Sequence, residues 1–183
     1  MSYFASLPAD AGVRHILALN PAAGQALVMF HSAALRNNGP LTPKDKELIA
    51  AYVSGLNACQ YCYGVHSQTA KAFGVPEDVL TQLLDNVDTA AVDERLKPLL
   101  RYARKLTQEP LRMTMADAQE VFDAGWEEAA LHDAVLTICL FNFMNRLLEG
   151  HGVKGSQDVF TTRGQALFEH GYDPLLALLQ GSR

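Results

Sequence analysis

Four residues within one stretch of the chain, Glu47, Cys59, Cys62 and His66, have types and spacing that could support chemistry at sulfur. If residues 58–73 are helical, the two cysteines and the histidine share an arc of roughly 60° on one helix face. Cysteines three residues apart on a helix also have Cα atoms within the span of roughly 4.4–6.8 Å that a disulfide tolerates. The spacing therefore predicts a thiol pair that can cycle between the reduced and the disulfide form.

Such a pair is reactive only if one thiol ionises readily. A thiol with an ordinary pKa of about 8.5 is only about 3% ionised at neutral pH, and lowering that pKa by about two units requires roughly 2.7 kcal/mol. Asn57 is predicted to be the N-cap of the helix, which places Cys59 in the first turn, where the helix dipole contributes up to ~2 kcal/mol. His66 could accept the proton of Cys62 or pair with its thiolate, and Glu47 could hold the imidazole in position.

The spacing of these four residues, within residues 42–75, resembles that of the carboxymuconolactone decarboxylase-like superfamily, in particular its alkyl hydroperoxidase D-type, peroxidase-related branch. The resemblance implies that Cys62 is the peroxidatic cysteine, Cys59 the resolving cysteine, His66 the base and Glu47 its partner in a proton relay. One departure is Tyr61, which stands where the best-studied hydroperoxidases of the family have a further histidine. The family's lactone decarboxylases lack the cysteine pair, which argues against that activity.

The same resemblance implies a thiol-dependent peroxidase that reduces organic hydroperoxides through a Cys62 sulfenate and a Cys59–Cys62 disulfide. An external dithiol of the lipoyl or thioredoxin type would reset the disulfide, and the protein would be a helical homo-oligomer. No metal, haem or flavin cofactor is implied, because sulfur performs the redox step.

Three alternatives remain open from the residues alone. The pair could serve redox sensing or thiol–disulfide exchange with little peroxidase turnover. A structural zinc site would need four ligands, and the histidines other than His66 are scattered along the chain. A hydrolytic or decarboxylating enzyme that uses Glu47 and His66 would leave both thiols without a role.

The third cysteine, Cys139, lies in an apolar run and is predicted to be a buried small hydrophobe.

Composition favours one domain, with neither nucleic acid nor membrane as a partner. The chain has 183 residues, 49% of them hydrophobic, which suits a single domain over residues 1–183. Charged residues make up 19%, below the roughly 25% usual for soluble domains, which favours burial of some surface in an oligomer. A net charge of −5 without a basic cluster argues against nucleic acid as a partner.

We expect a cytoplasmic location. Residues 1–12 lack the pattern of a secretory signal, and the longest apolar run, residues 134–141, is far shorter than the ~18 residues of a membrane span. Three cysteines, of which two are usefully spaced, suit a redox pair in a reducing compartment better than a structural disulfide framework.

Hydrophobic periodicity, caps and helix breakers predict an all-α helical bundle with about 8 helices, with the cysteine pair near the start of a central helix. The expected helices cover residues 8–19, 21–35, 43–56, 58–73, 75–84, 95–108, 114–124 and 127–149. The catalytic core spans about residues 40–152, and the apolar segment 153–183 packs on the domain or on a neighbouring subunit. Asn142, Asn145 and Arg146 are expected either to satisfy an interhelical hydrogen-bond network or to line the thiol pocket.

Overall fold

The protein is all-helical, as its periodicity predicted. The computed structural model describes residues 2–180, and these form ten α-helices and one short 3-10 turn without a strand. The elements are α1 (Val13–Ala18), α2 (Pro21–Leu35), α3 (Pro43–Leu56), α4 (Gln60–Ala72), α5 (Val79–Asp85), α6 (Leu96–Gln108), the 3-10 turn η1 (Pro110–Arg112), α7 (Met115–Asp123), α8 (Glu128–Gly150), α9 (Gln157–His170) and α10 (Asp173–Gln180).

Three parts of the chain differ from the expected helices. Helix α5 begins at Val79 rather than at residue 75. The first helix begins at Val13 rather than near residue 8, since residues 8–12 form turns and extended backbone instead. The C-terminal segment forms two helices, α9 and α10, which are separated by Gly171 with a φ of 60°. A glycine adopts that left-handed conformation without the steric cost that a side chain would bring. The predicted segment extends to residue 183, and residues 181–183 lie outside the described residues.

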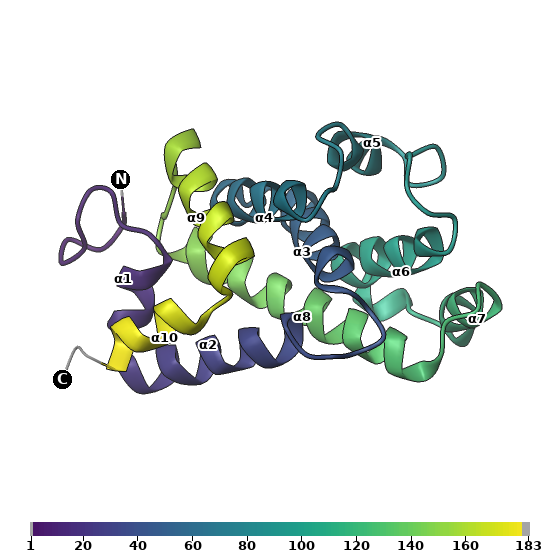
Figure 1. The fold of residues 1–183 in the computed structure, drawn as a ribbon, viewed down its shortest axis with the longest axis horizontal. Coiled ribbons are helices and arrows are strands. Elements are labelled where there is room, and N and C mark those ends of the chain that lie inside the picture. Colours follow the sequence, from purple (N-terminus) through teal and green to yellow (C-terminus); the bar gives the residue numbers. More distant parts are fainter. Residues whose placement is uncertain (1, 181–183) are drawn as a thin grey trace.

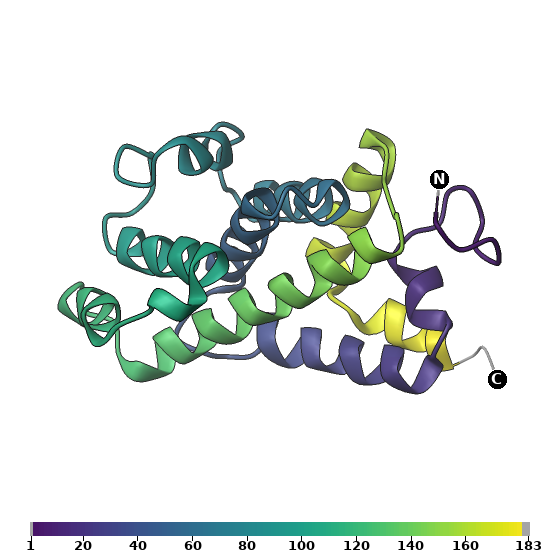
Figure 2. The same ribbon diagram turned by 180° about the vertical axis from the view of Figure 1, so that it is seen from behind.

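The long helix α8 runs through the molecule and connects its two ends (Figure 1). Helices α5, α6 and α7 gather at one end, whereas α1, α9, α10 and both ends of the chain lie at the other. Seen from behind, α8 runs diagonally across the middle of the molecule, with α2 below it (Figure 2). Helix α3 packs on α4 and α8, α4 packs on α9, and α10 packs on α2. The described part of the C-terminal segment therefore covers helices of its own chain.

Helix α3 forms the centre of this arrangement and is buried on every side. Nine consecutive residues, 46–54, are buried, among them the charged side chains of Lys46 and Glu47. Its start is fixed by a capping box between Thr42 and Asp45, with Pro43 at the first helical position. The buried Lys46 ammonium forms an ion pair with Asp133 of α8 at 3.1 Å. Each buried charge on α3 therefore has a partner from another helix.

The connection from α3 to α4 differs from the sequence prediction. Asn57 is the C-cap of α3 and not the N-cap of the thiol helix, because its side-chain amide donates hydrogen bonds to Asn142 and Asn145 of α8. Ala58 adopts a left-handed φ of 52° and reverses the chain. Cys59 is consequently the N-cap residue of α4, and Cys62 is at its third helical position. The helix begins two residues later than expected.

Two glycines allow α9 to lie directly over α4. A Cβ atom at Gly64 of α4 would lie 2.5 Å from the ring of Phe160, and one at Gly164 of α9 would lie 2.5 Å from the Gln68 side chain. Backbone atoms of α4 would also be only 3.0 Å from a Cβ at Gly164. The absence of side chains at these two positions thus sets the close approach of the helices.

The prediction that Cys139 is buried is wrong. Helix α8 buries one face and exposes the other, and its exposed stripe includes His132, Cys139, Phe143 and Arg146. These positions recur at intervals close to whole turns of a helix and therefore share one side. An apolar run in the sequence does not show which of its members face outward.

Candidate functional site

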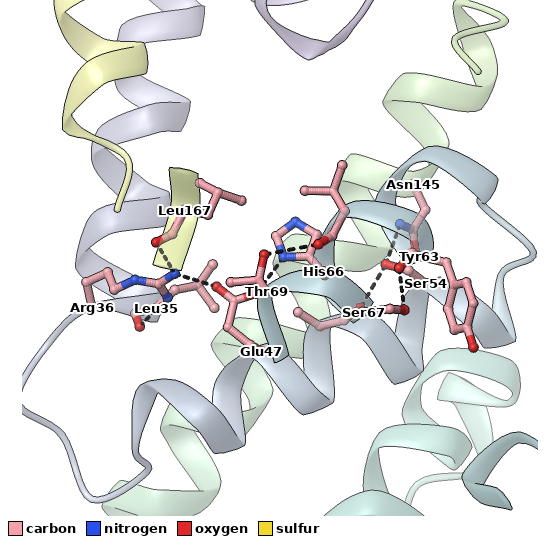
Figure 3. A network of polar contacts seen from close by, with 12 residues as sticks. Leu35, Arg36, Glu47, Ser54, Tyr63, His66, Ser67, Thr69, Asn145 and Leu167 are labelled. Carbon is pink, nitrogen blue, oxygen red and sulfur yellow. Dashed lines mark hydrogen bonds and ion pairs between the residues drawn. The ribbon is translucent and has the colours of Figure 1, made fainter. Parts of the chain in front are cut away.

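Glu47 and His66 lie together, as their spacing suggested. The Nδ1 atom of His66 on α4 is 2.6 Å from Oε2 of Glu47 on α3, and both side chains are largely shielded from solvent (Figure 3). The other carboxylate oxygen, Oε1, accepts a hydrogen bond at 2.6 Å from Arg36, the C-cap residue of α2. Arg36 also donates hydrogen bonds to the backbone carbonyls of Leu35 and Leu167. Sequence reasoning missed Arg36, because no local pattern links it to Glu47.

This arrangement keeps Glu47 ionised and selects the tautomer of a neutral His66. Burial alone would raise the pKa of Glu47, but the nearby His66 and Arg36 outweigh burial and hold the pKa below its usual value. Because a carboxylate only accepts hydrogen bonds, the proton of the neutral imidazole must sit on Nδ1 of His66. The Nε2 atom is then unprotonated and can act as a base.

The two cysteines are adjacent and buried, with exposed fractions of 0% for Cys59 and 4% for Cys62. A hydrogen bond from the Cys62 thiol lowers the pKa of Cys59, and the backbone N–H of Cys62 adds to this effect, whereas burial opposes it. The same hydrogen bond, together with burial, raises the pKa of Cys62 well above its usual value. Their shared hydrogen bond thus favours ionisation of Cys59 over ionisation of Cys62.

This result differs from the expectation that His66 acidifies Cys62 directly. The helix start contributes as expected, but it acts on Cys59, which is the N-cap residue and lies beside the backbone N–H groups of the first turn. His66 uses Nδ1 to bind Glu47, so only its Nε2 atom is available to a thiol. Cys62 therefore depends on a proton acceptor at the moment of reaction.

Asn145 supports Cys62 from the side of α8. It is 1% exposed, its Nδ2 donates to Ser54 Oγ at 3.0 Å, and its amide forms a hydrogen bond with Cys62 that lowers the pKa of this thiol. Asn142 belongs to the same network through Asn57 and Thr107. Asn145 thus belongs to the interhelical network, and its amide also contacts a reactive thiol without lining the cavity.

Arg146 takes part only at the edge of the network. Its guanidinium donates hydrogen bonds to the side-chain and backbone oxygens of Asn142, and the residue is exposed. It does not line the thiol pocket.

Cys62 and His66 line one cavity of about 490 Å³, whereas Cys59 does not. The walls are mainly apolar and come from helices α1, α2, α4, α8, α9 and α10, with Val65, Phe141, Met144 and Leu148 among them. Tyr61 is also a wall residue, as predicted, and its hydroxyl accepts a long 3.5 Å hydrogen bond from the backbone N–H of Val13. Of the two cysteines, only Cys62 therefore lines the space where a substrate could bind.

A second histidine, His31 of α2, lines the same cavity and was not singled out from the sequence. Its Nδ1 lies 2.7 Å from the carbonyl oxygen of Leu27 and must donate, because a carbonyl only accepts. Burial lowers the pKa of His31 to about 4, so the ring is neutral at physiological pH. Its ring also packs against Tyr172 of the C-terminal segment, with centroids 5.1 Å apart. Only the folded chain brings this residue near the thiols.

Metal and membrane features were searched among the described residues. Within residues 2–180, no group of three or more His, Cys, Asp or Glu side chains could hold a metal ion. In the same part of the chain, no helix combines the length and apolar character that crossing a membrane requires.

Comparison with known proteins yields one family and several similar folds. The carboxymuconolactone decarboxylase family matches residues 21–105. No curated protein matches the sequence. An uncharacterised peroxidase-related protein of Ralstonia eutropha JMP134, with an alkylhydroperoxidase AhpD core, has a TM-score of 0.73 at 24% identity, over 81% of this chain and 78% of that one.

Two further solved structures share the fold. A peroxidase-related protein of Silicibacter sp. TM1040 has a TM-score of 0.75 at 22% identity, over 81% of this chain and 78% of the other. The debrominase Bmp8 has a TM-score of 0.68 at 15% identity, over 91% and 82%. At these identities the likeness shows the fold alone. The carboxymuconolactone decarboxylase family thus matches residues 21–105 of this chain, and the solved structures share its fold.

Proposed function

We propose that this protein is a thiol-dependent peroxidase that reduces organic hydroperoxides with Cys62 as the attacking sulfur. The observation that carries the proposal is that Cys62 and His66 line the same cavity, while the second thiol, Cys59, lies behind Cys62 and is closed to solvent. One sulfur is thus open to a substrate and the other is adjacent to it. This is the division of roles that attack followed by disulfide formation requires.

In the first step, a proton must leave Cys62. The free Nε2 of His66 is the base that faces the cavity, and Glu47 stabilises the imidazolium that forms. The Cys62 thiolate attacks the distal peroxide oxygen and the O–O bond breaks. The sulfur is oxidised to sulfenic acid, and the alkoxide that leaves takes the proton from His66.

In the second step, Cys59 attacks the Cys62 sulfenic sulfur, which forms a disulfide and releases water. An external dithiol then reduces the disulfide. Because the Cys62 sulfur is 4% exposed and lies in the wall of a cavity, a slender lipoyl-type dithiol can approach it more easily than the broad surface of a thioredoxin-like protein. Sulfur carries both electrons in every step, so the mechanism requires no cofactor.

The walls of the cavity support an organic rather than an inorganic peroxide. Val65, Phe141, Met144 and Leu148 would be in contact with the body of the substrate, and burial of apolar surface contributes about 25 cal/mol per Å². Hydrogen peroxide has no apolar body and would gain nothing from these walls. We therefore expect bulky hydroperoxides to react better than hydrogen peroxide.

A redox-sensing or thiol–disulfide exchange protein is the second candidate. The observation that favours it is the raised pKa of Cys62, which keeps the attacking thiol protonated in the resting arrangement. Such a protein would form the same disulfide slowly and without repeated turnover. A rate measurement distinguishes the two candidates.

Assembly and location are part of the proposal. We propose that residues 1–183 act as one domain, because the cavity takes its lining from helices at the beginning, middle and end of the chain. Exposed apolar side chains such as Met29, Phe30 and Phe143 support a homo-oligomer. A cytoplasmic location would supply the reducing dithiol.

Stopped-flow measurements with cumene hydroperoxide test the proposal. The reduced protein should consume the peroxide much faster than free cysteine does, and Cys62→Ser should abolish the reaction. Cys59→Ser should complete one reaction and accumulate sulfenic acid. A rate equal to that of free cysteine, or a Cys62→Ser variant as fast as the native protein, would contradict the proposal. Disulfide formation without turnover in the presence of dihydrolipoamide would favour the sensor.

A further inference from the structure

Glu149, in the last turn of α8, lies close to the thiol pair. It lies one turn beyond Asn145, whose amide contacts Cys62, so the same face of α8 meets both sulfurs. The carboxylate of Glu149 interacts with the thiol of Cys59, while Asn145 interacts with Cys62. Glu149 does not line the cavity.

The two carboxylate oxygens of Glu149 have different environments. Oε2 forms an ion pair with Lys154 at 2.5 Å, near the surface. Oε1 is buried and has no hydrogen-bond partner. A buried carboxylate oxygen without a donor is unusual, because such a group loses its hydration without replacement. Here the unused oxygen belongs to a carboxylate that interacts with Cys59, a group that must lose a proton during the reaction.

We propose that Glu149 is the base that accepts the proton of Cys59 when this thiol attacks Cys62, and that it passes the proton to solvent. The inference rests on the proposed function and adds a second proton acceptor to it. Attack by Cys59 forms the S–S bond and breaks the S–O bond of the sulfenic acid. The Cys59 proton moves to Glu149 and from there to solvent, and the hydroxide that leaves takes a proton from solvent in the cavity, so that the net product is the disulfide and one water.

The exposure of the residues supports this direction of proton transfer. Cys59 is 0% exposed, so its proton cannot leave directly to solvent. The Glu149 side chain is 34% exposed and connects that buried sulfur to the surface. His66 is hydrogen-bonded to Glu47 through Nδ1 and lines the cavity, where Cys62 reacts. Each thiol would therefore have its own proton acceptor. During reduction of the disulfide, Glu149 would return a proton to the Cys59 thiolate.

The test follows closure of the disulfide without peroxide. All variants carry Cys139→Ser, so that only Cys59 and Cys62 react with dithiodipyridine, an aromatic disulfide. The first thiopyridone released reports a mixed disulfide at the accessible sulfur, and the second reports ring closure by the other thiol. Mass spectrometry identifies the sulfur that reacts first, which should be Cys62. Cys59→Ser should release only one equivalent.

Glu149→Gln should slow the second release by about 10²-fold, the typical contribution of a general base, and leave the first release unchanged. Its second release should then accelerate with rising pH, as for a thiol that ionises unaided. Glu149→Asp should recover part of the rate. If Glu149→Gln fails to fold, Glu149→Asp and the pH dependence of its second release still test the proposal.

Two control variants separate a base from a structural ion pair. Lys154→Gln removes the ion pair but keeps the carboxylate, and it should close the disulfide at the native rate. Glu128→Gln changes an exposed glutamate at the other end of α8 and should have no effect. Equal slowing by Lys154→Gln and Glu149→Gln, or an unchanged second release in Glu149→Gln, would overturn the inference. Failure of the peroxidase itself would appear separately, as absence of a fast reaction with cumene hydroperoxide.

Discussion

The guanidinium of Arg36 lies 2.6 Å from Oε1 of Glu47, a carboxylate with no exposure to solvent. Glu47 belongs to α3, whereas Arg36 is the C-cap residue of α2. An isolated buried carboxylate would take up a proton, but here Arg36 and His66 keep it ionised. The orientation of His66 therefore depends on an arginine that does not line the cavity.

Arg36→Gln should destabilise the fold and raise the pKa of Glu47. Loss of one partner from a buried ion pair costs about 3 kcal/mol, measurable by urea unfolding. The native contribution of Glu47 is complete above its unfolded pKa and is lost as pH falls through its lowered folded pKa. In the variant this loss should begin at a higher pH. Arg112→Gln, which removes an exposed ion pair with Glu109, is the control and should cost less than about 1 kcal/mol. Equal costs for the two variants would contradict the prediction.

Protonation of His31 should destabilise the protein in mild acid. Its pKa falls from 6.5 to about 4 on folding, so between these values the unfolded chain binds a proton that the native state does not. The free energy of unfolding is therefore unaffected by His31 above its unfolded pKa and should decrease by about 3 kcal/mol as pH falls to the folded pKa. His31→Gln should remove this part of the pH dependence of the free energy of unfolding. His170→Gln, at an exposed position, should retain it, and a His31→Gln curve as steep as the native one would refute the assignment.

Asn145→Ala should impair both stability and the reaction of Cys62. It removes the hydrogen bond to Ser54 Oγ and one of the two acceptors of the Asn57 amide, at a cost of about 1–3 kcal/mol in the free energy of unfolding. It also removes the hydrogen bond that opposes the raised pKa of Cys62. The rate of peroxide reduction at neutral pH should therefore fall. Asn142→Ala is the matched variant, since Asn142 shares the network without contacting a thiol. It should be destabilised but retain the rate.

Cys139 should be the first thiol to react with a bulky, polar alkylating reagent. It is exposed on α8, whereas Cys59 and Cys62 are buried. Partial shielding raises the pKa of Cys139, so the reaction should accelerate with pH. Peptide mapping of briefly alkylated native protein should identify this residue, and Cys139→Ser should abolish early labelling. Early labelling of Cys59 instead would show that the α3–α4 connection opens readily.

The sequence by itself determined the helical class, most helix starts and the residues on α3 and α4 that could carry chemistry. These features are local: a capping box at Thr42, a proline at position 43 and cysteines three apart act through neighbours in the chain. The N-cap of the thiol helix was predicted wrongly. The Asn57 side chain does not cap this helix, because it donates hydrogen bonds to Asn142 and Asn145 of α8. A tertiary hydrogen bond outweighed the local preference.

Only the tertiary structure decided which groups surround the thiols. Arg36, His31, Asn145 and Glu149 reach the site from α2 and α8, and their spacing in the sequence bears no relation to that of the cysteines. The direction of the pKa shifts also depends on these contacts, since burial and neighbouring charges are properties of the folded chain. The sequence thus identified the sulfurs, whereas packing decided which cysteine lines the cavity and which groups can accept its proton.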